Sequence, residues 1–232
     1  MKPSAWQIIF ILIVILGAII NADDGPKNRR VTINLGSVEV SREDSVIVVP
    51  VYFSNPYDTV SGIELHVRIE ENRHVVFAID DIGEDGLVKA IDTTGTLISG
   101  WEWVGVNSGE ENHYDFMLAA LADWPDGTVT PPLYPQEGGV LVKLVFRQDD
   151  LFPFTMDTHI KTTIETERTG VSDYLGNTIG IVTTIERQCE QFVGDSCLSW
   201  KQVRVGKLDS TVVKFNHGGI SVVDSVGNGG ER

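Results

Sequence analysis

Cysteine, basic residues and histidine are scarce in this sequence, and each shortage argues against a class of protein. Only two of the 232 residues are cysteine, so no dense disulfide framework can replace a hydrophobic core. Acidic residues outnumber lysine and arginine by 33 to 18. The resulting net charge of −15 repels phosphate backbones, which argues against nucleic acid as a partner. The five histidines are scattered, and no two of them have the spacing of a metal-ligand pair.

The motifs of common catalytic sites are also missing. The chain contains no Gly-x-Ser-x-Gly, no His-Glu-x-x-His and no phosphate-binding loop. Carboxylates such as Glu102, Asp115 and Asp123 are candidates for a glycosidase pair. A chain with 33 acidic residues, however, brings several carboxylates together by chance. We therefore expect a protein that is not an enzyme.

The N-terminal segment has the order of a secretory signal peptide. Lys2 precedes an almost wholly apolar run over 7–20, and the small residue Ala22 follows it. This run is shorter than the roughly 20 residues of a spanning helix, so cleavage after Ala22 is favoured over a retained membrane anchor. We expect a signal peptide over 1–22, a linker over 23–30 and a mature chain with no membrane span. The protein is then secreted, extracellular or at the cell surface, or periplasmic.

Export gives the cysteines a role. Seven residues lie between Cys189 and Cys197, and in an oxidising compartment such a pair is expected to close a local disulfide. A metal site there is disfavoured, because the nearest histidine is His217 and there is no second cysteine pair.

Alternating apolar residues dominate the mature chain. In 61–69, isoleucine, leucine and valine alternate with Glu64, His66 and Arg68, which predicts a half-buried strand with His66 on the solvent side. Pro50 suggests an edge or a bulge in its strand. The segment 115–122 is apolar enough for a helix, but its turn-rich flanks favour a strand. No stretch has a sustained helical period. Strands are expected at 31–40, 45–53, 61–69, 74–79, 96–106, 115–122, 140–146, 159–164, 179–186, 200–205, 211–215 and 219–223.

Strands that recur between turn signals predict an all-β antiparallel sandwich or barrel, and we expect a sandwich. Three blocks within it resemble a known family, the cohesin domains. They are Val48–Asn55 followed by Val60–Leu65, then Gly138–Phe146, and finally Phe215–Val222. The resemblance implies a jelly-roll sandwich of about nine strands over 31–223. It also implies a protein partner, typically a dockerin, or a scaffold role at the cell surface. The segment 165–210 is longer than the family pattern and is expected to be a long loop insertion, and 224–232 a disordered tail.

Aromatic residues offer a second hypothesis for function. Trp101 and Trp103 are two residues apart, so on a strand both side chains face the same way. Trp124 and Tyr134 flank a proline-rich loop. Exposed, coplanar rings of this kind stack on sugars, so a carbohydrate-binding module that takes polysaccharide on these four residues is the alternative to protein binding. If both tryptophans fill the core, the alternative loses its basis.

The acidic turn at 80–86 contains several hard oxygen ligands. Asp80, Asp81, Glu84 and Asp85 lie within six residues, and Ca²⁺ prefers carboxylate oxygens supplied by a loop. The spacing does not match an EF-hand. A solvated acidic turn and a structural Ca²⁺ site are both open, and no other cofactor is expected.

Overall fold

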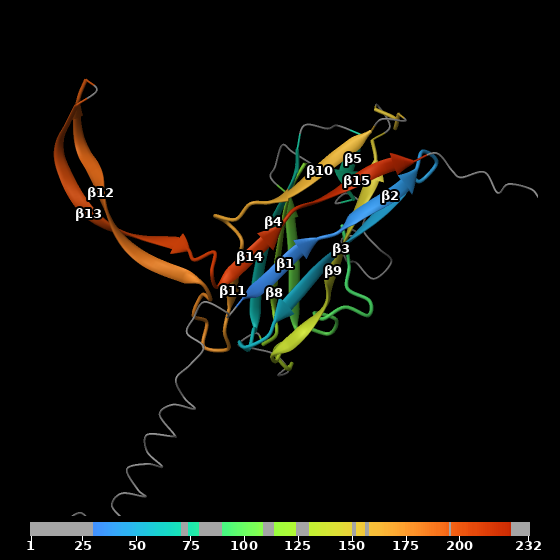
Figure 1. The fold of residues 1–232 in the computed structure, drawn as a ribbon, viewed down its shortest axis with the longest axis horizontal. Coiled ribbons are helices and arrows are strands. Elements are labelled where there is room, and N and C mark those ends of the chain that lie inside the picture. Colours follow the sequence, from blue (N-terminus) through green and yellow to red (C-terminus); the bar gives the residue numbers. More distant parts are fainter. Residues whose placement is uncertain are drawn as a thin grey trace, which may run out of the picture.

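The computed structural model describes residues 30–70, 74–78, 90–108, 114–123, 130–149, 152–155, 158–194 and 196–223. These residues form strands and turns and no helix. None of them belongs to a helix long and apolar enough to cross a membrane. The expected signal peptide, nearly all of the linker and the tail 224–232 lie outside the described residues. Two sheets pack face to face as a sandwich, and a separate hairpin extends from it (Figure 1).

One layer is a six-stranded sheet. Its order is β14-β1-β3-β9-β5, and β6 pairs with β9 beside β5. The central pair is β3 with β9, which run antiparallel from Val46 opposite Arg147 to Asn55 opposite Gln136. The bounds are β1 Val31–Leu35, β3 Val46–Asn55, β5 Val75–Phe77, β6 Ile91–Asp92, β9 Gln136–Gln148 and β14 Val213–Asn216.

The second layer is a seven-stranded sheet in the order β2-β15-β10-β4-β8-β7. The short strand β11 pairs with the start of β4, where β10 no longer lies beside it. The segment 115–122, which was ambiguous between helix and strand, contributes β8, which lies between β4 and the edge strand β7. The bounds are β2 Ser37–Ser41, β4 Gly62–Glu70, β7 Trp103–Ser108, β8 Asp115–Leu121, β10 His159–Ile164, β11 Gly170–Ser172 and β15 Gly218–Val223.

The first pair of strands and the last pair each cross from one sheet to the other, and the two crossings lie side by side. The first passes from β1 to β2 at Gly36, and the last passes from β14 to β15 at His217. These two strands run parallel, whereas the other pairs within the layers are antiparallel. The backbones approach so closely that a Cβ on Gly218 would lie 2.2 Å from the carbonyl oxygen of Gly36. Glycine is required because only backbone without a side chain fits there.

Alternation places the predicted apolar residues in one dry core between the layers. From β4 it receives the four alternate apolar residues beginning at Ile63, as expected. The ring of Phe77 lies 4.5 Å from that of Phe146 in its own sheet and 4.8 Å from that of Phe116 in the other. Aromatic pairs at this separation add to the stabilisation from burial. The predicted all-β sandwich is therefore confirmed.

Three expectations about single elements need correction. Pro50 is not at an edge, because β3 has neighbours on both sides. The bulge alternative comes closer, since a register shift against β9 lies between Val51 and Tyr52. The two layers hold six and seven strands, which is more than the roughly nine that were expected, because short strands such as β6 and β11 add to the long ones. The insertion contains a hairpin of β12, Ile181–Val193, and β13, Ser196–Leu208, which form their own two-stranded sheet.

Candidate functional site

The outer side of the seven-stranded sheet presents a shallow groove. Residues of β4, β8 and β7 that alternate with core residues point outward here, away from the apolar interior. One hollow of about 300 Å³ lies at the start of β4, and another of about 160 Å³ lies further along the strands. We call this surface the outer groove. It comprises Gly62, Glu64, His66, Trp103, Gly105, Asn107, Asp115, Met117, Ala119 and Leu121.

Trp103 is the aromatic residue of the groove. Its side chain is 39% exposed, and it begins β7 opposite Leu121. The ring lies across Gly105, since a Cβ there would be 2.6 Å from Cζ2 of the indole. Ala119 is opposite Gly105 on the neighbouring strand. Small residues thus form the floor, and a half-exposed indole forms one side.

The segment 165–178 forms the opposite side of the groove. It contains β11, and its Thr169 Oγ1 accepts a hydrogen bond of 3.0 Å from the backbone N–H of His66. His66 is 5% exposed, and its Nε2 lies 2.8 Å from Glu64 Oε1. The expectation that His66 faces solvent is wrong. The side chain does alternate outward, but a distant segment covers it.

A rigid turn lies at the rim of this side. The Asp173 carboxylate accepts hydrogen bonds from the backbone N–H groups of Leu175 and Asn177 and from the Asn177 side chain. The Asn177 amide, together with the backbone donors, lowers the pKa of Asp173. Tyr174 and Leu175 lie at the tip, each 69% exposed. The turn therefore holds two large side chains out in solvent next to the groove.

Charges gather at the other end of the groove and are paired. Arg68 Nε lies 3.0 Å from Asp115 Oδ1, and its Nη1 lies 3.8 Å from Glu165. The first contact is close enough for an ion pair, yet it is not aligned as a hydrogen bond, so its attraction is electrostatic. Arg168 also contacts Glu165 at 3.2 Å. The groove thus combines an apolar end with a polar, charge-paired end.

The structure separates the aromatic residues that the sequence grouped. Trp101 is 8% exposed and belongs to the core, while Trp103 lies on the outer groove. They do not share a strand face, because Trp101 precedes β7 in a turn where its N–H donates to the Ile98 carbonyl. Tyr134 is 64% exposed beside the bridge between Leu133 and Val60, away from the groove lining. Trp124 lies outside the described residues.

The expected acidic turn and its four carboxylates, Asp80, Asp81, Glu84 and Asp85, also lie outside the described residues. Within the part of the chain that the structure describes, no group of three or more histidine, cysteine or acidic residues could hold a metal ion.

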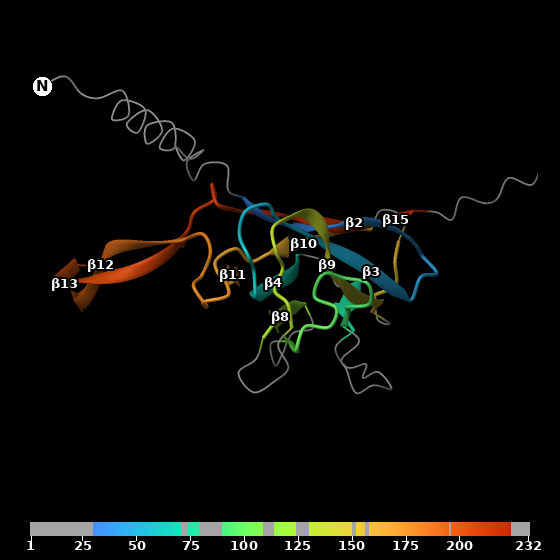
Figure 2. The ribbon, with the colours of Figure 1, turned by 90° about the horizontal axis from the view of Figure 1, so that it is seen from below.

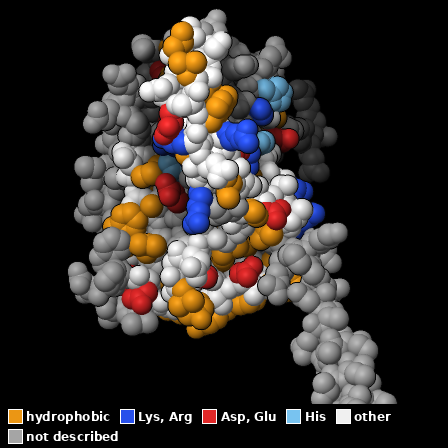
Figure 3. Space-filling model, turned by 90° about the vertical axis from the view of Figure 1, so that its left-hand side faces the viewer, with side chains coloured by type: hydrophobic (Ala, Val, Ile, Leu, Met, Phe, Trp, Pro, Cys, Tyr) orange, Lys and Arg blue, Asp and Glu red, His pale blue; other side chains and the backbone are white. Residues whose placement is uncertain are grey.

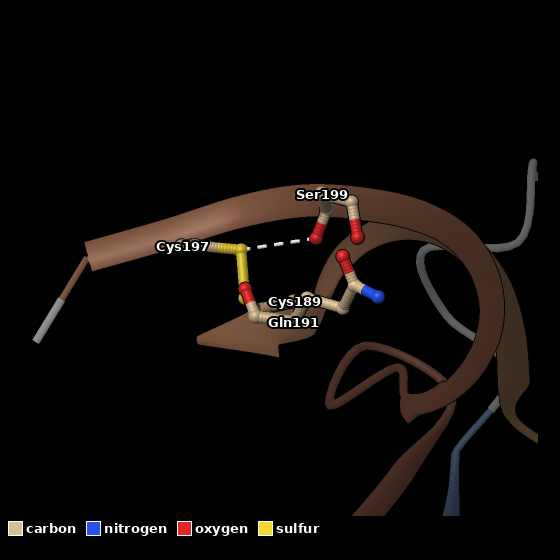
Figure 4. The surroundings of a disulfide bond; sticks show 4 residues. All are labelled: Cys189, Gln191, Cys197 and Ser199. Atoms are coloured by element: carbon tan, nitrogen blue, oxygen red, sulfur yellow. Dashed lines mark hydrogen bonds between the residues drawn. A yellow bond between two sulfur atoms is a disulfide. The ribbon is translucent and has the colours of Figure 1, made fainter. Parts of the chain in front are cut away.

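The expected disulfide between Cys189 and Cys197 is present near the end of the β12–β13 hairpin (Figure 4). Their Cα atoms are 5.8 Å apart. The sulfur atoms lie 3.1 and 3.0 Å from the carbonyl oxygens of Gln191 and Ser199. Because oxidised sulfur has no hydrogen to donate, these are close S···O contacts and not hydrogen bonds. The bond ties the two strands of the hairpin together next to a register shift.

Sequence reasoning missed the groove residues on β8. Met117, Ala119 and Leu121 are outward and half-buried, whereas Phe116, Leu118 and Ala120 fill the core. The signal was present: a strand that is apolar on both faces has either a second layer over it or an exposed apolar surface. The segment 165–178 covers part of this strand and leaves the rest open.

Comparison with known proteins returned no matching family model and no matching curated protein. Solved structures do resemble the chain. One is a type III cohesin module from a cell-surface anchoring scaffoldin of Ruminococcus flavefaciens, with 12% identity over 88% of this chain and 93% of that one, at a TM-score of 0.48. Another is a non-cellulosomal cohesin from Archaeoglobus fulgidus, with 15% identity, coverage of 85% and 94%, and a TM-score of 0.42.

A third is a type I cohesin from Clostridium thermocellum, solved in complex with a dockerin. It has 12% identity over 84% of this chain and 95% of that chain, at a TM-score of 0.44. All three are cohesins. This is the family whose strand blocks the sequence resembles.

Proposed function

We propose that this domain is a non-catalytic binding module that recognises a protein partner through the outer groove. The observation that supports the proposal is the exposure of Trp103 beside a floor of Gly105 and Ala119, with Met117 and Leu121 next to them. Protein interfaces concentrate their binding energy in a few aromatic and apolar anchors ringed by polar residues. The ion pairs of Arg68 supply such a polar rim at the other end.

The geometry favours protein over polysaccharide as the partner. Stacking on a sugar chain uses coplanar exposed rings, and the proposed pair is broken because Trp101 is buried. Trp103 alone remains at the groove, next to apolar side chains and across from the segment that carries the exposed Tyr174 and Leu175. A surface of this composition suits side chains of a folded partner.

The partner and the location follow from the sequence. The strand blocks resemble cohesins, so a dockerin-like module is the first partner to test. The signal-like N-terminus and the Cys189–Cys197 disulfide support action outside the cytoplasm, as a secreted or surface-attached part of an extracellular assembly.

The test compares two substitutions that add the same charge on opposite sheets. Ala119→Glu places a carboxylate in the groove, and Val48→Glu places one on the outward, 44% exposed side of β3. A partner is captured from the source organism's secretome on the parent protein, identified, purified and titrated against both variants by calorimetry. We expect Ala119→Glu to weaken binding roughly 100-fold, since a charge at an interface centre is left unpaired, and Val48→Glu to bind as the parent. Equal affinities for both variants would refute the assignment of the groove.

A further inference from the structure

The hairpin β12–β13 has an architecture separate from the sandwich. Its strands pair only with each other, over 13 residues each. It extends away from the two layers and curves, as Figures 1 and 2 show from two directions. Its base is closed by a hydrogen bond of 2.7 Å from the Asp209 N–H to the Gly180 carbonyl. Gly180 also packs against Val213 so closely that a Cβ there would be 2.4 Å from that side chain, which anchors the hairpin to the core strand β14.

The two faces of the hairpin differ in chemistry. Register places Ile185 opposite Arg204, Arg187 opposite Gln202, and Cys189 opposite Trp200, all on one face. We call this the arginine face. Ile185 is 67% exposed and Trp200 58% exposed. The described residues include no ion pair to either arginine of this face, and none of its paired residues from 185 to 204 is acidic.

The opposite face is partly satisfied. Glu186 and Lys207 form an ion pair there, and Val203 and Val205 are half-buried. Lys201 lies on this face as well, opposite Gln188. Val182 of this face is 48% exposed, so the arginine face offers more unused binding groups but not all of them.

Exposing this surface needs an explanation. An isolated two-stranded hairpin is marginally stable in water, and contiguous exposed apolar side chains on a soluble protein mark sites of association. Tryptophan, isoleucine and arginine are residues that anchor protein interfaces. Figure 3, which views the molecule from the hairpin's side, shows hydrophobic side chains next to those of lysine and arginine.

The net charge of the hairpin indicates which kind of surface it binds. The segment 181–208 holds four of the 18 basic residues and only three of the 33 acidic ones. It is therefore net positive, while the rest of the chain has a net charge of −16. The complement of a cationic hairpin is an acidic protein surface, and the sandwich of a second copy supplies one at equal concentration.

The contact area of one hairpin face favours a dimer in which each copy's hairpin contacts the other copy. One face of a two-stranded hairpin with 13-residue strands is about 44 Å long and about 10 Å wide, a footprint of roughly 440 Å². A standard interface covers about 800 Å² on each partner. Two hairpins used reciprocally about a two-fold axis offer roughly 900 Å².

We propose that the protein forms a two-fold dimer in which the arginine face of each hairpin docks on the acidic sandwich of the second copy. Ile185 and Trp200 supply the apolar contact, and Arg187 and Arg204 pair with carboxylates of the partner. The arginine face lies on the hairpin and not in the outer groove. It therefore adds a second interaction surface to the binding module.

The test uses the protein secreted by an exporting host. Sedimentation velocity from about 1 to 100 µM covers the range in which such an interface dissociates. Arg204→Glu reverses a charge on the arginine face, and Lys201→Glu makes the same change on the opposite face. Trp200→Ser removes the main apolar anchor. Since all these side chains are exposed, the variants should fold, and circular dichroism with thermal melting confirms it.

We expect a concentration-dependent dimer in the parent and in Lys201→Glu, and a dissociation constant raised at least roughly tenfold in Arg204→Glu and Trp200→Ser. A parent that stays monomeric throughout would overturn the proposal, and so would a dimer that all three variants leave unchanged. A parallel arm uses vesicles of neutral and anionic lipid. A monomer that binds these vesicles through Trp200 would also overturn the dimer, because the hairpin would then bind a lipid surface.

Discussion

The indole of Trp103 covers Gly105, and a Cβ at residue 105 would lie 2.6 Å from its Cζ2 atom. Valine at this position must displace the ring from the floor of the outer groove. We expect Gly105→Val to raise acrylamide quenching of tryptophan emission and to weaken partner binding at least roughly tenfold. Tyr52→Val is the control, because Tyr52 is an exposed outward residue of β3 on the opposite sheet. Equal binding by the two variants would contradict the role of Trp103.

The crossing of the terminal strands predicts a sharp difference between two glycines. A Cβ on Gly218 would meet backbone oxygen at 2.2 Å, whereas one on Gly170 would meet only a methyl group at 3.9 Å. We expect Gly218→Ala to lower the free energy of unfolding by roughly 3 kcal/mol, because backbone atoms must move. Gly170→Ala should change it by less than about 0.5 kcal/mol. Denaturant titration measures both, and similar values for the two would show that the crossing is looser than described.

The contact between Thr169 and His66 fixes one side of the groove. Thr169→Val keeps the volume but removes the hydroxyl that accepts the buried His66 N–H. We expect a loss of about 1–3 kcal/mol in unfolding free energy, since a buried donor is left without a partner. Thr169→Ser retains the acceptor and should recover most of it. If valine is as stable as the parent while serine is destabilised, the hydrogen bond contributes little and packing of the methyl group dominates.

Asp92 should make stability depend on pH. The Lys143 ammonium donates to its carboxylate at 2.8 Å and, with the Thr94 donors, lowers the pKa of Asp92 from 3.8. A lowered pKa stabilises the fold above the unfolded value near 3.9, and this contribution is lost as pH falls through the folded pKa.

Asp92→Asn keeps the acceptor of the Thr94 N–H and removes the charge. We expect it to be slightly less stable than the parent at about pH 7, with the difference closing toward about pH 2. Chemical denaturation across this range measures the difference. A difference in stability between the two proteins that stays constant with pH would show that the charge of Asp92 is not its cause.

The disulfide should matter to the hairpin and not to the sandwich. Replacing Cys189 and Cys197 with serine frees a short loop near the end of β12 and β13, a local cost of roughly 2–3 kcal/mol. Limited proteolysis should then cut within 181–208 faster than in the parent, while the main thermal transition keeps its midpoint. A large fall in that midpoint would mean that the hairpin and the sandwich unfold together.

The regularity of the sequence decided what could be predicted. Period-2 alternation identified β4, β9 and β10 and the sandwich that they form, because core packing enforces it. The burial of His66 could not be found that way, since Thr169 lies a hundred residues downstream. The long insertion was expected to be a loop, although strand-like stretches at 179–186 and 200–205 were recognised within it. Cross-strand pairing extends both stretches into β12 and β13, and only long-range register reveals that.

The site was predicted in part. Trp103 was selected, but the two-residue spacing that joined it to Trp101 applies only within a strand, and β7 begins at Trp103 itself. The apolar outward side chains of β8 looked like core, because apolar residues on an open face and in an interior have the same sequence signature. The groove emerges only when the neighbouring strands and the segment 165–178 are in place.

Hydrogen exchange on the partner complex tests the central claim most directly. We predict that the captured partner slows exchange in β4, β8 and β7, whose outward residues form the outer groove, and leaves β3 and β9 of the opposite sheet unchanged. Protection confined to β3 and β9, or to the β12–β13 hairpin, would contradict the account.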